Sequence, residues 1–150
     1  MINHIWTVLC KNSSIDSETN NFNLFEVLEQ VTVNLKPNSS KRVGNEQMPV
    51  VLPYHSVTLW ERDEIGKEEV FDIRIEVVDP SDKVLAKFNH TVKFDRNARR
   101  LRARFTNDVL PVTSEGIYHY RVLLKDDLPD MYVVKAEVPI EVGLKIDKVK

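Results

Sequence analysis

Strict alternation of apolar and polar side chains is the strongest constraint that this sequence places on its fold. In residues 71–77 four apolar side chains alternate with three charged ones: Phe71, Ile73, Ile75 and Val77 against Asp72, Arg74 and Glu76. A period of two residues is typical of a β-strand with one buried face and one face in water. Asp79 and Pro80 then predict a turn, and residues 84–88 predict the returning strand of a hairpin.

The same period recurs later in the chain. Residues 101–105, 116–124 and 132–142 each predict a strand, with Gly116 as a turn residue, and residues 5–10 and 57–60 are shorter runs of strand type. We expect Trp6 and Trp60 in the core. The alternation further predicts one core built from these inward side chains: Phe71, Ile73, Ile75, Leu101, Ala103, Phe105, Tyr118, Tyr120, Val134, Ala136 and Val138.

Residues 22–35 fit two structures. Leu24, Leu28 and Val31 fall at the spacing i, i+4, i+7, which favours a helix. Residues 31–33 read VTV, which favours a strand. We favour the strand, because the surrounding strands need partners.

About eight short strands separated by turns predict a mainly β fold, an antiparallel two-sheet sandwich of immunoglobulin-like or similar type with little helix. The length of 150 residues is that of one domain, so residues 1–150 are interpreted as a single β-sandwich domain. Within it, residues 36–49 are rich in Asn, Ser, Lys and Gly and predict a mobile loop. Residues 145–150 predict a frayed tail.

Composition narrows the class of protein. Apolar residues make up 42% of the chain and charged residues 29%, which is typical of a globular domain and argues against disorder and against a membrane span. The formal net charge of -2 gives no global field that would attract nucleic acid or anionic lipid. Cys10 is the only cysteine and the opening residues lack a basic leader, so we expect a cytoplasmic protein of a bacterium or of a phage in its host.

Four segments carry a family resemblance. Residues 6–10, 15–20 and 24–31 read WTVLC, IDSETN and LFEVLEQV, and residues 116–118 read GIY. They resemble the opening and the penultimate strand of a family of small uncharacterised bacterial and phage β-sandwich domains of unknown function. The resemblance covers most of the chain, and it implies a β-sandwich without implying an activity or any site residue.

The densest cluster of charge consists of five arginines: Arg96, Arg99, Arg100, Arg102 and Arg104. Alternation places the last three on one face of one strand, where such a row is able to follow a phosphate backbone. The alternative is a solvated strand face whose arginines pair across the sheet with acids such as Asp72 and Glu76. We favour the solvated face, because no stacking aromatic side chains are interleaved with the arginines.

Acidic turns and histidines are weaker candidates for a metal site. Carboxylates gather in two predicted turns, as Ca²⁺ requires: Asp79 and Asp82 in one, and Asp126, Asp127 and Asp130 in the other. Neither turn has the spacing of a calcium motif, and Asp favours turns without a metal. The histidines show no paired metal-binding spacing: His4, His55, His90 and His119. We expect no metal and no cofactor.

The sequence contains no nucleophilic G-x-S-x-G motif and no phosphate-binding glycine loop, and Cys10 is expected in or near the core. We therefore expect a non-catalytic intracellular module that binds an unknown protein partner or itself, as in a homodimer, through sheet edges and faces. Two alternatives stay open. One is nucleic-acid or phosphate-ligand binding through the Arg96–Arg104 strand, and the other is a hydrolase with a site assembled from scattered His and Asp residues.

Overall fold

The structure, a computed structural model, describes residues 1–35 and 48–146. These residues form nine β-strands and no helix, which confirms a mainly β fold and adds one strand to the number expected. The strands are β1 (Ile2–Ile15), β2 (Phe22–Val27), β3 (Gln30–Leu35), β4 (Met48–Arg62), β5 (Glu69–Val78), β6 (Val84–Phe94), β7 (Arg100–Val112), β8 (Gly116–Lys125) and β9 (Tyr132–Ile146).

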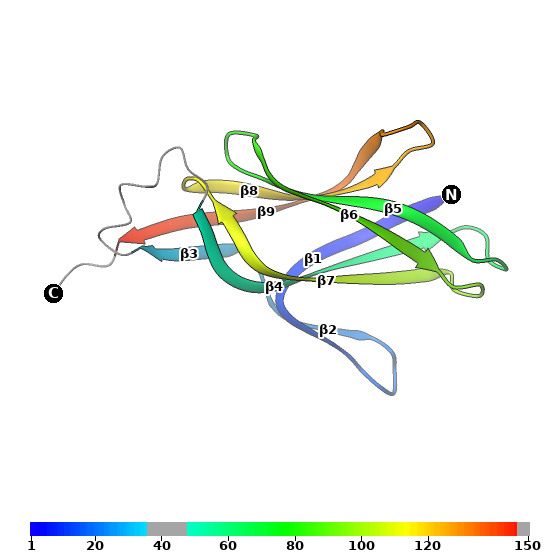
Figure 1. The fold of residues 1–150 in the computed structure, drawn as a ribbon. Coiled ribbons are helices and arrows are strands. Elements are labelled where there is room, and N and C mark those ends of the chain that lie inside the picture. Colours follow the sequence, from blue (N-terminus) through cyan, green and yellow to red (C-terminus); the bar gives the residue numbers. More distant parts are fainter. Residues whose placement is uncertain (36–47, 147–150) are drawn as a thin grey trace.

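The strands form two sheets, ordered β2-β1-β4-β7 and β3-β9-β8-β5-β6 (Figure 1). Neighbouring strands are antiparallel except for β3, which runs parallel to β9. The expectation of purely antiparallel sheets is therefore wrong at this edge. Leu28 and Glu29 form a short link that carries the chain from one sheet to the other, so β3 pairs with β9 instead of with its neighbour in sequence.

Residues 22–35 form two strands joined by Leu28 and Glu29, and the helical interpretation of this segment is wrong. The single apolar stretch of the sequence splits into β2 and β3, which belong to different sheets and account for the ninth strand. Glu26 has a positive φ of 52° just before the split. The link itself is held by both sheets, because the Leu28 amide donates to the Leu9 carbonyl at 2.7 Å and the Glu29 carbonyl accepts from Glu141 at 2.9 Å.

The four-stranded sheet is strongly curled, as the bends of β4 and β7 show in Figure 1. The pairing of β4 with β7 shifts register between Val51 and Tyr54, and such an irregularity increases local bending. The curl brings Phe22 of β2 against Arg102 of β7, although the two strands are opposite edges of the same sheet.

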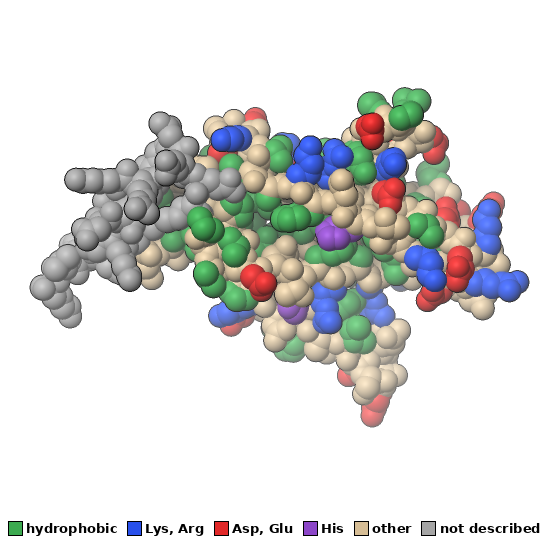
Figure 2. Space-filling view, viewed as in Figure 1, with side chains coloured by type: hydrophobic (Ala, Val, Ile, Leu, Met, Phe, Trp, Pro, Cys, Tyr) green, Lys and Arg blue, Asp and Glu red, His purple; other side chains and the backbone are tan. Residues whose placement is uncertain are grey.

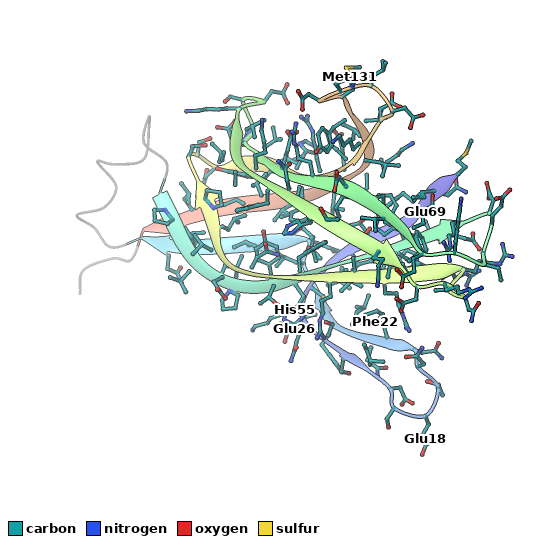
Figure 3. All side chains as sticks on the ribbon, turned by 45° about the vertical axis from the view of Figure 1, so that its right-hand side comes forward. Glu18, Phe22, Glu26, His55, Glu69 and Met131 are labelled. Carbon is teal, nitrogen blue, oxygen red and sulfur yellow. The ribbon has the colours of Figure 1, made fainter. Side chains whose placement is uncertain are left out.

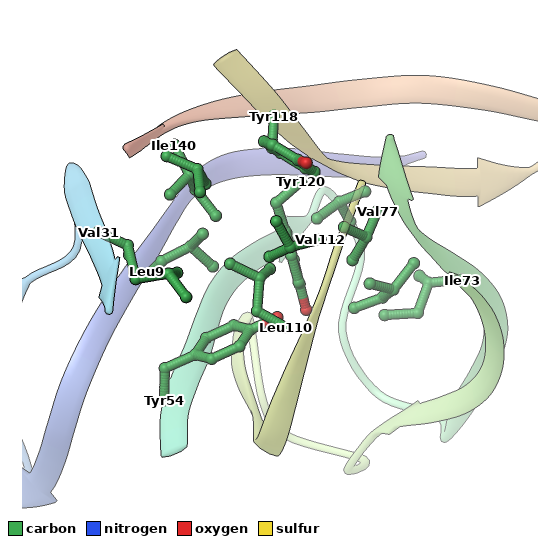
Figure 4. Close-up of a cluster of buried hydrophobic side chains, with 14 of the residues drawn as sticks. Leu9, Val31, Tyr54, Ile73, Val77, Leu110, Val112, Tyr118, Tyr120 and Ile140 are labelled. Carbon is green, nitrogen blue, oxygen red and sulfur yellow. The ribbon is translucent and has the colours of Figure 1, made fainter. Parts of the chain in front are cut away.

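The hydrophobic core lies between the two sheets (Figure 4). Trp60 and Cys10 are buried as expected, whereas Trp6 is only half-buried. Six of the side chains that were expected to point inward are buried: Phe71, Ile73, Ile75, Ala103, Tyr118 and Tyr120. Four more are partly buried against the core: Leu101, Phe105, Ala136 and Val138.

Val134 is the member of the predicted core that the structure contradicts, since it is 45% exposed. In the pairing of β8 with β9, Val122 is opposite Ala136 but Leu123 is opposite Val134, so Lys135 is an extra residue on β9. An extra residue reverses the alternation of faces. Val134 therefore leaves the core face that Ala136 occupies.

The turn between β5 and β6 is built as the sequence predicts. The buried Asp79 carboxylate accepts hydrogen bonds from the Ser81 amide and the Thr113 hydroxyl, both at 2.9 Å. Gly116 begins β8 with a φ of 138°, a conformation that side chains rarely adopt. A Cβ atom at this position would lie 2.7 Å from Cγ of Pro80, so the two turns pack against each other only with glycine here.

Tyr118 locks the turn between β7 and β8. Its hydroxyl accepts hydrogen bonds from the backbone amides of Thr113 at 2.9 Å and Ser114 at 3.0 Å, and it donates to the Ser114 carbonyl at 2.6 Å. The side chain is fully buried. The hydroxyl thus satisfies backbone groups of a tight connection between the two sheets.

Arg62 holds the opposite end of the domain. Its side chain is 1% exposed, and its guanidinium lies over the ring of Phe94 at 5.0 Å from the centroid. The Glu69 carboxylate is 3.6 Å away. Four hydrogen bonds of 2.7 to 3.1 Å run from the guanidinium to backbone carbonyls in two connections, those of Lys67, Asp95, Arg96 and Ala98.

Strands occupy the described residues of the predicted loop and of the predicted tail. Residues 48 and 49 belong to β4, and residues 145 and 146 belong to β9. The remainder of both predictions, residues 36–47 and 147–150, lies outside the described residues.

Candidate functional site

The arginine row lies on β7, in the four-stranded sheet, with Arg96 and Arg99 in the connection before it. Asp72 and Glu76 lie on β5 of the other sheet, so the expected pairing of the arginines with these acids is wrong. The cause is the change of sheet between β6 and β7, which alternation within a strand does not reveal. The strand beside β7 is β4.

Each guanidinium of the row contacts protein. Arg100 lies 3.5 Å from the Glu61 carboxylate of β4. Arg102 donates to the Asn20 carbonyl and lies 4.7 Å from the centroid of the Phe22 ring. Three further contacts go to backbone carbonyls: Arg104 to Ser13 at 3.4 Å, Arg96 to Gly66 at 3.0 Å and Arg99 to Asp63 at 2.9 Å. Arg102 and Arg104 therefore tie the β1–β2 hairpin to β7, and Arg96 and Arg99 tie the β4–β5 connection to the β6–β7 connection.

The other sequence candidates do not assemble into a metal site. The described residues contain no group of three or more His, Cys, Asp or Glu side chains that is able to hold a metal ion. Of the two acidic turns, the one with Asp79 has that carboxylate bonded to its own turn and to Thr113. The carboxyl groups of the second turn are exposed: Asp126, Asp127 and Asp130.

His55 lies beside two side chains that are potential nucleophiles, those of Ser13 and Cys10. Its Nδ1 lies 2.8 Å from the Ser13 hydroxyl, and Cys10 is its direct partner across β1 and β4. Figure 3 shows His55, Glu26 and Phe22 along the side from which the β1–β2 hairpin projects. Burial raises the pKa of the Cys10 thiol, so the thiol stays protonated at neutral pH. No described carboxylate forms an ion pair with His55, so the Ser13–His55 pair lacks an acidic group to orient it.

A cleft lies between β6 and β7 in the described structure. β6 and β7 are edge strands of different sheets, and His90 of β6 stacks on Phe105 of β7 with ring centroids 4.3 Å apart. Beyond this stack the strands diverge (Figure 1), and a cavity of about 800 Å³ opens between the sheets. Figure 2 shows this face, where hydrophobic side chains and a histidine gather between the two sheets.

The cleft is lined mainly by apolar side chains of the core. Ile75 and Val77 of β5 form part of the floor, and Phe88 of β6 and Phe105 of β7 contribute to the two sides. Phe88 is opposite Ile75 in the β5–β6 register, so its side chain is on the core face of the sheet. It is nevertheless 50% exposed, because no described element covers it.

The polar groups inside the cleft are uncharged. Burial raises the pKa of Tyr54 to about 12, raises the pKa of Tyr120 as well, and lowers the pKa of His90. Tyr120 donates a hydrogen bond of 2.5 Å to the Ser56 hydroxyl, and the rings of Tyr54 and Tyr120 meet edge to face at 6.3 Å. Only Arg104 and Asp108 among the described lining residues carry charge at pH 7, and both are exposed.

Comparison with protein-family models and with curated proteins finds no match for the chain. No described segment is a helix long and apolar enough to cross a membrane.

The sequence offered one signal for the cleft, which sequence reasoning did not use. His90 and Asn107 interrupt the apolar side of their strands: His90 is opposite Ile73 and Asn107 is opposite Tyr54 in the sheet registers. Polar side chains at inward positions are typical of a ligand-binding cavity or of a buried polar network. The two residues alone do not predict the cleft, because the sheet topology decides which strands face each other across it.

Proposed function

We propose that this domain is an immunoglobulin-like sandwich that binds a segment of a partner protein in the cleft between β6 and β7, without catalysis. In immunoglobulin-like domains a tyrosine of the penultimate strand bonds back to the preceding corner, and a cysteine two residues later bridges the sheets. Tyr118 supports this classification through its bonds to Ser114. Tyr120, two residues later, reaches Ser56 of the other sheet, so a hydrogen bond stands in the place of the disulfide.

The observation that carries the proposal is an apolar cleft between two unpaired strand edges. An extended peptide is able to add a strand to such an edge, with main-chain hydrogen bonds for affinity and side-chain pockets for specificity. β6 and β7 each end a sheet in the described structure, and the half-exposed Phe88 of β6 lines the cleft from the core face of its sheet. One added strand therefore gains backbone partners and covers apolar surface in the same step.

Self-association and nucleic-acid binding are the competing functions. A second copy of the chain has to present its own edge to the same cleft, and sedimentation at micromolar concentration reports whether a homodimer forms.

The arginine row is a weaker basis for function, because each guanidinium has a protein partner. We expect the intact protein to show no salt-dependent affinity for nucleic acid, and alanine at Arg100, Arg102 and Arg104 to leave its binding unchanged.

We propose the cytoplasm as the compartment, since the single cysteine is a buried free thiol.

A displayed library of random peptides tests the proposed function on the intact chain. We expect enrichment of extended peptides in which uncharged apolar residues alternate, and protection of β6 amides from hydrogen exchange when such a peptide is bound. Phe88→Ser should weaken binding about 10-fold or more, as loss of a central aromatic contact does. Phe25→Ser is the matched control, because Phe25 is also half-exposed, at 51%, but lies on β2. Absence of enriched peptides, or equal weakening by both variants, would contradict the proposal.

A further inference from the structure

We propose that the Tyr54 hydroxyl is the recognition group of the cleft, and that it donates a hydrogen bond to a carbonyl oxygen in an uncharged part of the bound segment. This inference rests on the proposed function and specifies the chemistry of the ligand at the floor of the same cleft.

Tyr54 differs from the two other fully buried tyrosines in that its hydroxyl has no hydrogen-bond partner among the described residues. The Tyr118 hydroxyl bonds to Ser114 and the Tyr120 hydroxyl bonds to Ser56. Tyr54 is 2% exposed, yet no described residue forms a hydrogen bond with its hydroxyl, and burial is the sole cause of its raised pKa. This hydroxyl is therefore free to donate a hydrogen bond to a ligand without breaking a bond to any described residue.

The unpartnered hydroxyl borders the cavity. Tyr54 lines the cleft, and its oxygen is not among the fully enclosed side-chain atoms that lack a partner. Figure 4 shows the Tyr54 ring reaching from β4 toward Leu110 and Tyr120 in the space between the sheets. A group that enters between β6 and β7 and reaches the floor therefore meets this hydroxyl.

The surroundings select an uncharged acceptor. Ile75, Val77 and Tyr120 form the adjacent floor, and none of them compensates a buried charge. Arg104, the one Lys or Arg among the described lining residues, directs its guanidinium to Ser13 of β1. A carboxylate at the floor would lack a counter-ion, whereas a carbonyl needs only the one donor that Tyr54 offers. The main-chain carbonyls of an extended peptide supply such acceptors at every residue.

Two matched variants and one neutral probe test this inference. Prodan is an uncharged naphthyl ketone whose emission moves to longer wavelength when its carbonyl accepts a hydrogen bond. We expect prodan bound to the wild-type protein to emit at longer wavelength, a red shift, than prodan bound to Tyr54→Phe. Tyr54→Phe should bind prodan about 3- to 10-fold more weakly and without the red shift, the effect of one lost hydrogen bond. The enriched peptides should lose affinity for Tyr54→Phe by a similar factor.

Stability separates a ligand contact from a structural one. Tyr54→Phe should leave the urea midpoint unchanged or slightly raised, because it removes a hydroxyl that has no partner. Tyr120→Phe should lower the midpoint, because it breaks the bond to Ser56. A midpoint lowered equally in both variants would overturn the inference, and so would unchanged prodan and peptide affinity in Tyr54→Phe.

The two proposals fail in different ways. If no peptide is enriched but prodan binding depends on Tyr54, the proposed protein-binding function fails and the recognition chemistry stands. If peptides bind through Phe88 with full affinity for Tyr54→Phe, the function stands and the role of Tyr54 is wrong. If prodan does not bind the wild-type protein and the peptides are indifferent to Tyr54, the inference is refuted.

Discussion

Replacing Arg62 by alanine should destabilise this domain more than replacing any other arginine of the described chain. The side chain is 1% exposed and gives four hydrogen bonds to backbone carbonyls at 2.7 to 3.1 Å. Hydrogen bonds from charged groups are worth about 1.5–3 kcal/mol each, a gross loss of roughly 6–12 kcal/mol for four. Folding of the alanine variant no longer has to remove a guanidinium from water, which returns several kcal/mol. We therefore expect a net loss of about 3–5 kcal/mol in the free energy of unfolding.

Urea denaturation followed by tryptophan fluorescence measures this loss, since Trp60 is buried in the core. Arg100→Ala is the control, because Arg100 is exposed and lies 3.5 Å from Glu61 in a surface pair. Such a pair contributes about 0–1 kcal/mol. Arg62→Lys should be intermediate, because an ammonium group keeps the charge but lacks the planar fork that reaches both connections. Equal midpoints for Arg62→Ala and Arg100→Ala would refute the idea that Arg62 holds this end of the domain.

Three further changes test the connections between strands, each by the urea midpoint. Tyr118→Phe should lower the free energy of unfolding by about 1–3 kcal/mol, because backbone groups of the β7–β8 turn lose their partner. Gly116→Ala should be destabilising, because of its φ of 138° and the contact at 2.7 Å, whereas Gly143→Ala has no atom within 4 Å to displace. Burial alone raises the pKa of Asp79, but its hydrogen bonds outweigh burial and hold the pKa below the usual value. The stability that the ionised Asp79 contributes is thus present above about pH 3.9 and lost as pH falls through the lower folded-state pKa, so Asp79→Asn should reduce the acid-induced loss of stability.

Period-two alternation predicted the strands and most of the core because it is a local rule. Phe71, Ile73 and Ile75 are buried on an uninterrupted strand, where each residue fixes the face of the next. The rule fails at Val134, where one extra residue on β9 reverses the faces. A bulge of this kind depends on the partner strand, so the sequence of β9 alone does not reveal it.

The arrangement of strands was less accessible from the sequence than the strands themselves. The arginine row was expected to pair with acids such as Asp72 on a strand of the same sheet, yet β5 and β7 belong to different sheets. The cleft has the same origin. It exists because β6 and β7 are consecutive in the chain but separate between sheets, and no local pattern in either strand encodes that separation.

Some buried polar groups of this domain have hydrogen-bond partners in the described structure and others have none. This difference separates the structural groups from the candidate recognition group. Arg62, Asp79 and Tyr118 are satisfied by backbone groups of the connections that they hold. Trp60 Nε1 has no partner in the described structure, but it is fully enclosed, so no ligand reaches it without unfolding the core. Among the described side chains that are fully buried, the Tyr54 hydroxyl combines the lack of a described partner with a place on the cavity surface. A structural role for the Tyr54 hydroxyl would require a hydrogen-bond partner among the described residues. Because this hydroxyl instead faces an apolar opening between two strand edges, it suits an occupant that places a carbonyl oxygen at the same depth.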